Sequence, residues 1–212
     1  MALKKKWYEI ISPKMFGEKR VGDTLSVDPS GLIGRKIEVS MLELSNSYQK
    51  FYVKACFQIV HVDGDRAFTK FVGHDIMRER LYRMVQRYGR RIDCIQDVTS
   101  KDGVKIRVKT VFMLIKRVGT SLKNACRAYA TEIIDNIAKE TNFEDFVRMS
   151  IEGDIQQQVR AEVTKIYPVG NIEIRKTEVM GDKPVAEKKK RAKKHTEKVA
   201  EEPKKENVEL SS

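Results

Sequence analysis

The stretch DIMRERLYRMVQRYGRR, residues 75–91, continues into IDCIQDVTSKDGVKIRVKT, residues 92–110, and these two segments decide the predicted fold. The first segment has apolar residues at helical spacing, which predicts a helix with one buried stripe. The stripe consists of Met77, Leu81, Met84, Val85 and Tyr88. Asp75 is a suitable N-cap for this helix. The second segment predicts a β-hairpin that turns at Asp102-Gly103.

Basic residues gather on the outer side of both predicted elements. On the helix, arginines form a second stripe, set away from the apolar one. These arginines are Arg80, Arg83, Arg87, Arg90 and Arg91. In the second strand of the hairpin, apolar and basic residues alternate, so the basic ones share one face. The apolar positions are Val104, Ile106 and Val108, and the basic ones are Lys105, Arg107 and Lys109. We therefore expect an apolar floor beneath a cationic outer face.

The charge of the chain is concentrated in this same region. The 212 residues include 42 basic and 30 acidic ones, a net charge of +12. Before residue 183 there are 32 basic and 24 acidic residues, and residues 70–118 alone hold 13 basic and 5 acidic ones. A merely solvated helix face would interleave the two signs, but Glu79 is the only acid in this helix after its cap. A focused, arginine-rich surface favours contact with the phosphates of a nucleic acid.

The predicted RNA-binding residues extend from this region to neighbouring basic positions. They are Lys4, Lys5, Lys6, Arg78, Arg80, Arg83, Arg87, Arg90, Arg91, Lys101, Lys105, Arg107, Lys109, Lys116 and Arg117.

The remaining sequence predicts an α+β protein with a mainly antiparallel sheet and flanking helices. A second hairpin covers residues 51–72 and turns at Asp63-Gly64-Asp65, after a short strand near residues 36–41. Helices are expected from Thr120 or Ser121 and from Asn142, with Gly153 bending or splitting the latter. The core face predicted for the first of these helices is Leu122, Ala125, Cys126, Tyr129, Ile133, Ile134 and Ile137. A final strand follows at residues 171–179.

Composition divides the chain into an extended basic and aromatic segment at residues 1–30, a globular domain at 31–180 and a disordered tail at 181–212. In the first segment, Trp7 suits either stacking on an RNA base or stapling the terminus to the core with Tyr8, Ile10 and Phe16. In the tail, residues 188–191 suit either a localisation signal or a nucleic-acid arm.

Cysteine spacing and hydropathy indicate the cellular compartment of the protein. Cys56, Cys94 and Cys126 show no paired spacing, which argues against a disulfide framework or a zinc site and fits a reducing cytosol. The chain has no apolar run long enough to span a membrane and no signal-peptide pattern, so we expect neither membrane insertion nor secretion.

Catalytic patterns are weak throughout the sequence. His61, His74 and His195 form no constellation, and no hydrolase, metalloprotease or dinucleotide motif occurs. The GLIGRK stretch at residues 31–36 resembles the RNA-clamping loop of KH domains, but a strand pattern follows it where that fold needs a helix. A nuclease gathering Asp63, Asp93 and Asp97 around a metal is the remaining enzymatic alternative. We expect no catalytic residue, no metal site, no cofactor and no small-molecule substrate.

Co-linear blocks of sequence carry a resemblance to a known family. They are residues 5–10, 13, 16–17, 21–25, 32–35, 37–40, 71–74, 91–93, 99–103, 132–134, 138–140, 165–168 and 172–176. In these blocks the chain resembles the archaeal and eukaryotic small-subunit ribosomal proteins of the S-three-Ae family. Eukaryotic members carry a longer basic leader, and its absence here indicates an archaeal member. Many members have basic residues after Pro168, where this chain has Val169, Gly170 and Asn171.

The resemblance implies a curved, barrel-like antiparallel sheet with flanking helices. It also implies a structural role on the platform of the small ribosomal subunit, near the messenger exit and the 3′ end of the small-subunit rRNA. The expected partners are that rRNA, neighbouring ribosomal proteins and messenger RNA near the exit, all in the cytoplasm. A free RNA-binding or RNA-chaperone module is the alternative function.

Overall fold

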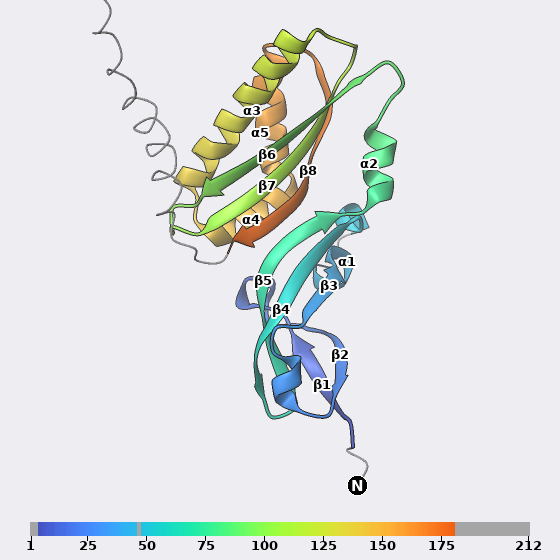
Figure 1. Ribbon diagram of the computed structural model, residues 1–212, viewed down its shortest axis with the longest axis vertical. Helices are drawn as coiled ribbons and strands as arrows, with labels where there is room; N and C mark the ends of the chain where they lie inside the picture. Colours follow the sequence, from blue (N-terminus) through green and yellow to red (C-terminus); the bar gives the residue numbers. More distant parts are fainter. Residues whose placement is uncertain (1–3, 46–47, 181–212) are drawn as a thin grey trace, which may run out of the picture. The chain divides into compact units, whose positions relative to one another are not determined.

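The computed structural model describes residues 4–45 and 48–180, and in these residues the chain forms an α+β fold (Figure 1). The predicted fold class is therefore confirmed. The strands are β1 (Lys6–Ile11), β2 (Arg20–Ser26), β3 (Lys36–Ser40), β4 (Val53–Asp63), β5 (Arg66–Ile76), β6 (Arg90–Thr99), β7 (Lys105–Leu114) and β8 (Val169–Met180). The helices are α1 (Met41–Ser45), α2 (Arg78–Met84), α3 (Thr120–Glu140), α4 (Phe143–Glu152) and α5 (Asp154–Thr164). The strands belong to one eight-stranded sheet.

Strand β5 is the centre of this sheet because it has three partners. It pairs with β4 along its whole length, with β1 in parallel at residues 66–68, and with β8 in antiparallel fashion at residues 73–75. The same edge of β5 thus pairs with β1 near the start of β5 and with β8 near the end of β5. The sheet continues from β1 to β2 on one branch and from β8 through β7 to β6 on the other.

The predicted barrel-like closure is wrong, because the sheet is open. Its main path ends at β2 and β6, with β3 as a further edge beside β4. The sheet also branches at β5, where β1 and β8 share one edge. The prediction of a mainly antiparallel sheet is confirmed, since the three-residue pairing of β1 with β5 is the parallel exception among the described strands.

Gly73 allows β5 and β8 to meet closely. A Cβ atom at this position would lie 2.0 Å from the backbone oxygen of Thr177 in β8, which no side chain tolerates. The sequence predicted Asp75 as the N-cap of a helix. That prediction is wrong, because residues 73–75 are the part of β5 that pairs with β8.

The helix predicted over residues 75–91 is much shorter than expected. Asp75 lies in β5, Met77 takes the N-cap position, and α2 ends at Met84. Leu81 and Met84 are buried as predicted, whereas Val85 and Tyr88 are exposed. After the turn of residues 85–89, in which Gly89 comes close to the carbonyl oxygen of Leu114, the chain enters β6 at Arg90.

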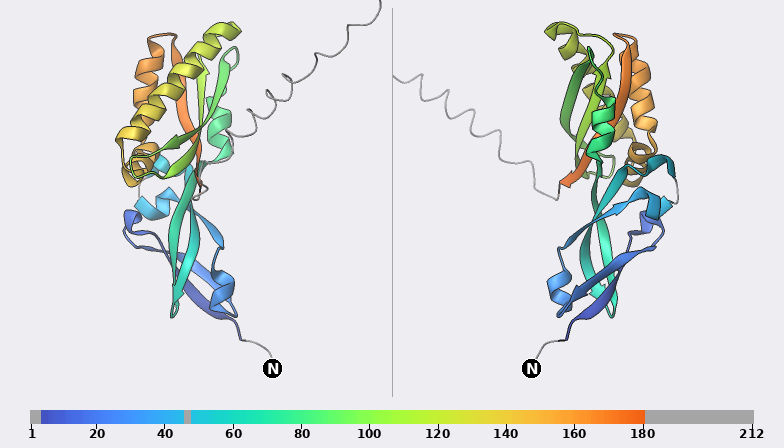
Figure 2. Two further views of the ribbon diagram at one scale, coloured as in Figure 1. Left: turned by 60° about the vertical axis from the view of Figure 1, so that its left-hand side comes forward. Right: turned by 90° about the vertical axis from the view of Figure 1, so that its right-hand side faces the viewer.

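Helices α3 and α5 cover one face of β6, β7 and β8 (Figures 1 and 2). As predicted, Asn142 is the N-cap of α4, and Gly153 separates α4 from α5 with a left-handed φ of 102°. One detail of α3 was wrong, because Gly119 and not Thr120 or Ser121 is its N-cap. Its predicted core face is confirmed except at Ala125, which is exposed. The most buried positions are Cys126, Ala130, Ile134 and Ala138, and the small side chains among them let the helix approach the sheet closely.

The N-terminal segment contributes the hairpin β1–β2, although its sequence showed little periodicity. Tyr8 and Ile10 are buried and attach it to the rest of the fold. Phe16 packs edge-on against Phe57, with 5.4 Å between the ring centroids. Trp7, in contrast, is 67% exposed. The interpretation that this segment is attached to the core by its aromatic and apolar residues is therefore correct for the neighbours of Trp7 and wrong for Trp7 itself.

Candidate nucleic-acid interface

The predicted RNA-binding residues do not form one continuous surface. The first group, at one end of the β6–β7 hairpin, is Arg87, Arg90, Lys116 and Arg117. The second, on the sheet face away from α3, is Arg91, Lys105, Arg107 and Lys109. The third, on α2, is Arg78, Arg80 and Arg83. The last, at other places, is Lys4, Lys5, Lys6 and Lys101.

Two loops converge to build the first group. One is the turn of residues 85–89 between α2 and β6, and the other is the segment after β7 that begins at Ile115. Arg90 pairs with Leu114 in the sheet, so the two loops leave the same end of the hairpin (Figure 1). Gln86 and Ile115 also line one small cavity between them. We call Arg87, Tyr88, Arg90, Lys116 and Arg117 the arginine tip.

The side chains of the arginine tip are exposed. None of its four cations makes an ion pair with another of the described residues. The guanidinium of Arg87 lies over the ring of Tyr88, with its central carbon 5.5 Å from the ring centroid. Four unpaired positive charges on a loop surface, beside an exposed aromatic ring, are the groups that phosphates and bases bind.

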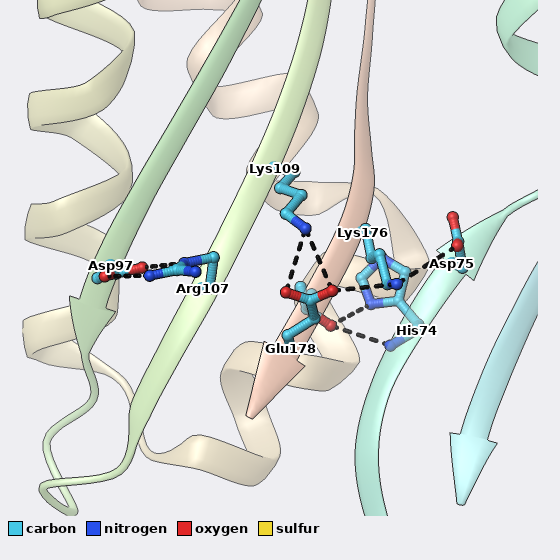
Figure 3. A network of polar contacts seen from close by, with 8 residues as sticks. His74, Asp75, Asp97, Arg107, Lys109, Lys176 and Glu178 are labelled. Atoms are coloured by element: carbon cyan, nitrogen blue, oxygen red, sulfur yellow. Dashed lines mark hydrogen bonds and ion pairs between the residues drawn. The ribbon is translucent and has the colours of Figure 1, made fainter. Parts of the chain in front are cut away.

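The second group behaves differently because three of its cations, all but Lys105, have carboxylate partners among the described residues. Arg91 pairs with Asp93 at 2.8 Å and Arg107 with Asp97 at 2.7 Å. Lys109 and Lys176 reach Glu178 at 3.1 and 3.0 Å. Lys176 also lies 3.9 Å from a carboxylate oxygen of Asp75 (Figure 3). We call this row of ion pairs across β6, β7, β8 and β5 the charged ladder.

The Glu178 carboxylate of the ladder is held in its ionised form. The hydrogen bond from Lys176, reinforced by Lys109, keeps the pKa of Glu178 below its usual value. The hydrogen bond to Asp97 raises the pKa of Arg107. The alternation predicted for β7 is confirmed, since Ile106 and Val108 are buried on the helix side. Its outer face, however, carries both positive and negative charges. The alternation in β7 did not reveal the negative ones, because Glu178 and Asp75 belong to strands that are distant in sequence.

Arg80 is a partly buried residue with a structural role in this fold. Its guanidinium donates to Glu173 of β8 at 2.9 Å and lies 4.7 Å from the ring centroid of Tyr52. Burial alone would lower the pKa of Arg80, but the hydrogen bond and attraction to Glu173 outweigh burial and raise it. The Glu173 side chain is only 10% exposed, so Arg80 neutralises an otherwise buried charge. Arg78 and Arg83 remain exposed on the same helix.

Lys101 and the three N-terminal lysines lie away from the arginine tip. Lys101 is in the turn that joins β6 to β7, at the opposite end of that hairpin. Lys6 begins β1 and pairs with Ser26 of β2. Trp7 pairs with Leu25, and both side chains are exposed. This hairpin is therefore a second basic and aromatic surface, separate from the tip.

The residues considered for a metal-dependent nuclease are not gathered in one place. Asp93 and Asp97 are each engaged with an arginine in the charged ladder, and Asp63 ends β4. Among residues 4–45 and 48–180, no group of three potential ligands is close enough to hold a metal ion. His61 is stacked on Phe68 with 4.9 Å between ring centroids, and His195 lies outside the described residues.

His74 is fully enclosed where β5 meets β8. Its Nε2 atom lies 3.3 Å from the carbonyl oxygen of Ile174, and its Nδ1 atom lies 2.8 Å from the hydroxyl of Thr177. A proton on Nε2 allows that nitrogen to donate while Nδ1 accepts, so the neutral ring is satisfied. Burial lowers the pKa of His74 to about 4. The residue therefore has a structural role as a neutral histidine in the strand junction.

The exposed aromatic residues beside the tip are what sequence reasoning missed. Tyr82 is 72% exposed and Tyr88 is 67% exposed, although helical spacing had placed Tyr88 in the core. Gly89 indicated that the helix ends before residue 91, but no local signal placed its end at Met84. Across the described parts of the chain, no helix combines the length and apolarity that are needed to span a membrane.

Comparisons with known proteins agree with the motifs described above. The model of the ribosomal S3Ae family matches residues 2–183. A small ribosomal subunit protein eS1 from Saccharolobus islandicus is 37% identical over 176 residues, covering 83% of this chain and 85% of that protein. The eS1 protein of Archaeoglobus fulgidus is 37% identical over 185 residues, covering 86% and 88%. That of Sulfurisphaera tokodaii is 35% identical over 176 residues, covering 83% and 91%. The resemblance seen in the sequence is confirmed, and the chain belongs to the ribosomal S3Ae family.

Proposed function

We propose that the protein is a structural component of the small ribosomal subunit and that it binds the rRNA of that subunit through the arginine tip. The observation that carries this proposal is the set of four exposed, unpaired cations at the tip, in a chain whose family relatives are named as small-subunit proteins. The role is one of assembly and support rather than catalysis. The family resemblance further suggests the platform, near the messenger exit and the 3′ end of the rRNA.

The physical basis of binding is charge and shape. Each phosphate neutralised by an arginine or lysine releases counterions, so several contacts together give strong, salt-dependent affinity. Guanidinium groups also form two parallel hydrogen bonds with a phosphate. Side chains cannot enter the deep major groove of A-form RNA, so the tip is expected to grip backbone and irregular loops. The charged ladder contributes less, because phosphates there would compete with carboxylates already in place.

In our proposal, the basic surface of the β1–β2 hairpin makes further contacts with RNA. Lys4, Lys5 and Lys6 lead into the β1–β2 hairpin, where the exposed Trp7 offers a ring for RNA or for a neighbouring ribosomal protein. Messenger RNA near the exit is a further partner that the proposed location would bring close. Within an archaeal cell such a protein would work in the cytoplasm, as part of the ribosome.

Two variants with the same change in net charge test the assignment of the tip. One replaces Arg87, Arg90, Lys116 and Arg117 with Gln, and the other replaces Arg91, Lys105, Arg107 and Lys109 with Gln. We expect the tip variant to weaken binding to a small-subunit rRNA fragment by about 10²–10³-fold at physiological salt and to lower the salt slope by about 3. The ladder variant should lose less than about tenfold. Equal losses in the two variants would contradict the assignment.

Sedimentation of native lysate tests the ribosomal role itself. In a sucrose gradient at low and at moderate salt, the protein should run with the small-subunit peak and be nearly stoichiometric with it. Retention at moderate salt is expected when protein neighbours and folded RNA add to the electrostatic attraction. Recovery only at the top of the gradient in growing cells would instead support a free RNA-binding or RNA-chaperone module.

A further inference from the structure

Tyr88 occupies a backbone position that suits a different residue. The turn of residues 86–89 is closed by a hydrogen bond from the Gly89 amide to the Gln86 carbonyl, 3.2 Å long. Tyr88, the third residue of this turn, has a φ of +70°, whereas Arg87 before it does not have a positive φ. This is the pattern of a type II turn, in which glycine or asparagine is preferred at the third position. A bulky residue with positive φ is an outlier, and strained positions of this kind cluster at functional sites.

Packing does not account for the tyrosine. Its ring is 67% exposed, and the contact that the turn makes with β7 is made by Gly89, whose added Cβ would lie 3.0 Å from the Leu114 oxygen. Glycine at position 88 would therefore form the same turn with less strain. The effect of the positive φ is to hold a large ring in solvent, among the cations of the arginine tip.

The surroundings of the ring suit a nucleotide base. The Arg87 guanidinium lies within cation–π range of one face, 5.5 Å from the ring centroid, which leaves the other face available for stacking. Tyr82, in the last turn of α2, has a second exposed ring. The backbone carbonyl of Tyr82 accepts a hydrogen bond from the amide of Val85, the first residue of the loop. Bases in a continuous duplex have no open face, whereas bases in loops, bulges and single strands do.

We infer that Tyr88 stacks on an unpaired RNA base, and that Arg90, Lys116 and Arg117 hold the phosphates flanking that base. The ligand of the arginine tip is thus an RNA loop or bulge rather than an uninterrupted helix. This inference rests on the proposed function, because it names the class of RNA that the same tip recognises.

The test compares two RNAs and four variants of the full chain. One RNA is a stem-loop with 2-aminopurine in its loop, and the other is a blunt duplex of the same length and composition. Tyr88→Ala should raise the Kd for the stem-loop about five- to 150-fold, the loss expected for one stacked base. It should leave the duplex Kd within about twofold. Tyr88→Phe should retain tight binding, and the 2-aminopurine quenching seen with the wild type should persist in it.

Two further variants separate stacking from folding. Tyr88→Gly should lose stem-loop affinity like Tyr88→Ala while its thermal midpoint stays equal or rises, because glycine relieves the positive φ. Tyr48→Ala is the matched control, since Tyr48 is 81% exposed on another part of the described surface and should not affect either RNA.

Each other outcome overturns the inference in a distinct way. Equal loss on stem-loop and duplex would make Tyr88 a scaffold for phosphate contacts. Unchanged RNA affinity, with the variant released from small subunits, would assign the ring to a protein neighbour. A wild-type protein that binds neither RNA would contradict the proposed function, whereas tight wild-type binding with no effect of Tyr88→Ala would contradict only the stacking.

Discussion

The arginine tip and the charged ladder hold the same kinds of residue and use them in opposite ways. At the tip, loops present Arg87, Arg90, Lys116 and Arg117 to solvent without an ion-pair partner in the described residues. On the ladder, the regular spacing of strands places each of several cations opposite or beside a carboxylate, as for Arg107 with Asp97 at 2.7 Å. A count of basic residues cannot distinguish these two surfaces.

The comparison shows that availability, rather than number, makes a cation useful for binding. A phosphate approaching the ladder must displace or repel a carboxylate, whereas a phosphate at the tip displaces only water and counterions. Exposed ion pairs contribute little to stability, about 0–1 kcal/mol each. The ladder therefore does more to set the local charge balance than to hold the sheet together, which makes the two surfaces separable by experiment.

The largest effect is expected beneath the ladder, at His74. Burial lowers the pKa of His74 to about 4, below the ordinary 6.5, so the unfolded chain binds a proton more readily than the folded one. The stability that the neutral ring contributes is present above about pH 6.5 and is lost as pH falls toward 4. The loss amounts to about 3 kcal/mol. Urea unfolding at a series of pH values measures it.

Two variants give the control for this pH dependence. His74→Asn should flatten the fall in stability between pH 6.5 and 4, whatever its effect at neutral pH. His61→Gln should leave the fall unchanged, because His61 is exposed on β4. A His74→Asn protein that keeps the full slope would show that other groups cause the acid sensitivity.

An intermediate effect is expected at Arg80, which separates structural arginines from those of the tip. Arg80→Ala leaves the nearly buried carboxylate of Glu173 without its partner and should cost about 2 kcal/mol, less than a fully buried pair would, because Arg80 itself is 39% exposed. The thermal midpoint should fall by about 4–8 °C. Arg87→Ala should instead leave the midpoint unchanged and weaken RNA binding.

A double variant shows whether the loss of stability comes from the unpaired carboxylate of Glu173. Arg80→Ala with Glu173→Gln leaves no buried carboxylate and should recover part of the lost stability. If Arg80→Ala reduced the salt slope of RNA binding as much as Arg87→Ala did, the structural role of Arg80 would be refuted.

The smallest effect is expected when the ladder is made more like the tip. Glu178→Gln removes the carboxylate that holds Lys109 and Lys176 at 3.1 and 3.0 Å. Releasing one or two cations should raise affinity for duplex RNA by about five- to 30-fold and steepen the salt slope by one to two. Stability should change by less than about 1 kcal/mol. Filter binding across a salt series measures the change.

The control for this variant has the same change in charge elsewhere. Glu140→Gln, at the exposed end of α3, should raise affinity by less than about twofold. Equal gains in the two variants would mean that net charge alone sets the affinity, and the distinction between ladder and tip would not hold.

Local pattern was sufficient for much of this protein. The alternation of Val104 to Lys109 and the Asp102-Gly103 turn predicted the β6–β7 hairpin, because strand periodicity and turn chemistry act within a few residues. Gly153 predicted the break between α4 and α5 for the same reason. The family was visible in short co-linear motifs, and the basic residues of the arginine tip were among those predicted to bind RNA.

Only the tertiary structure decided which of those residues are available. Helical spacing placed Tyr88 in the core, but α2 ends at Met84 and leaves the tyrosine in solvent. Local pattern could not separate Arg80 and Lys109 from Arg87, since their partners Glu173 and Glu178 lie 93 and 69 residues away along the chain. Whether the sheet is open or closed was also undetermined, because it depends on pairings between strands that are distant in sequence, such as β5 with β1 and β8. Sequence specifies local geometry and the supply of charge, whereas contacts between distant strands decide where that charge is neutralised.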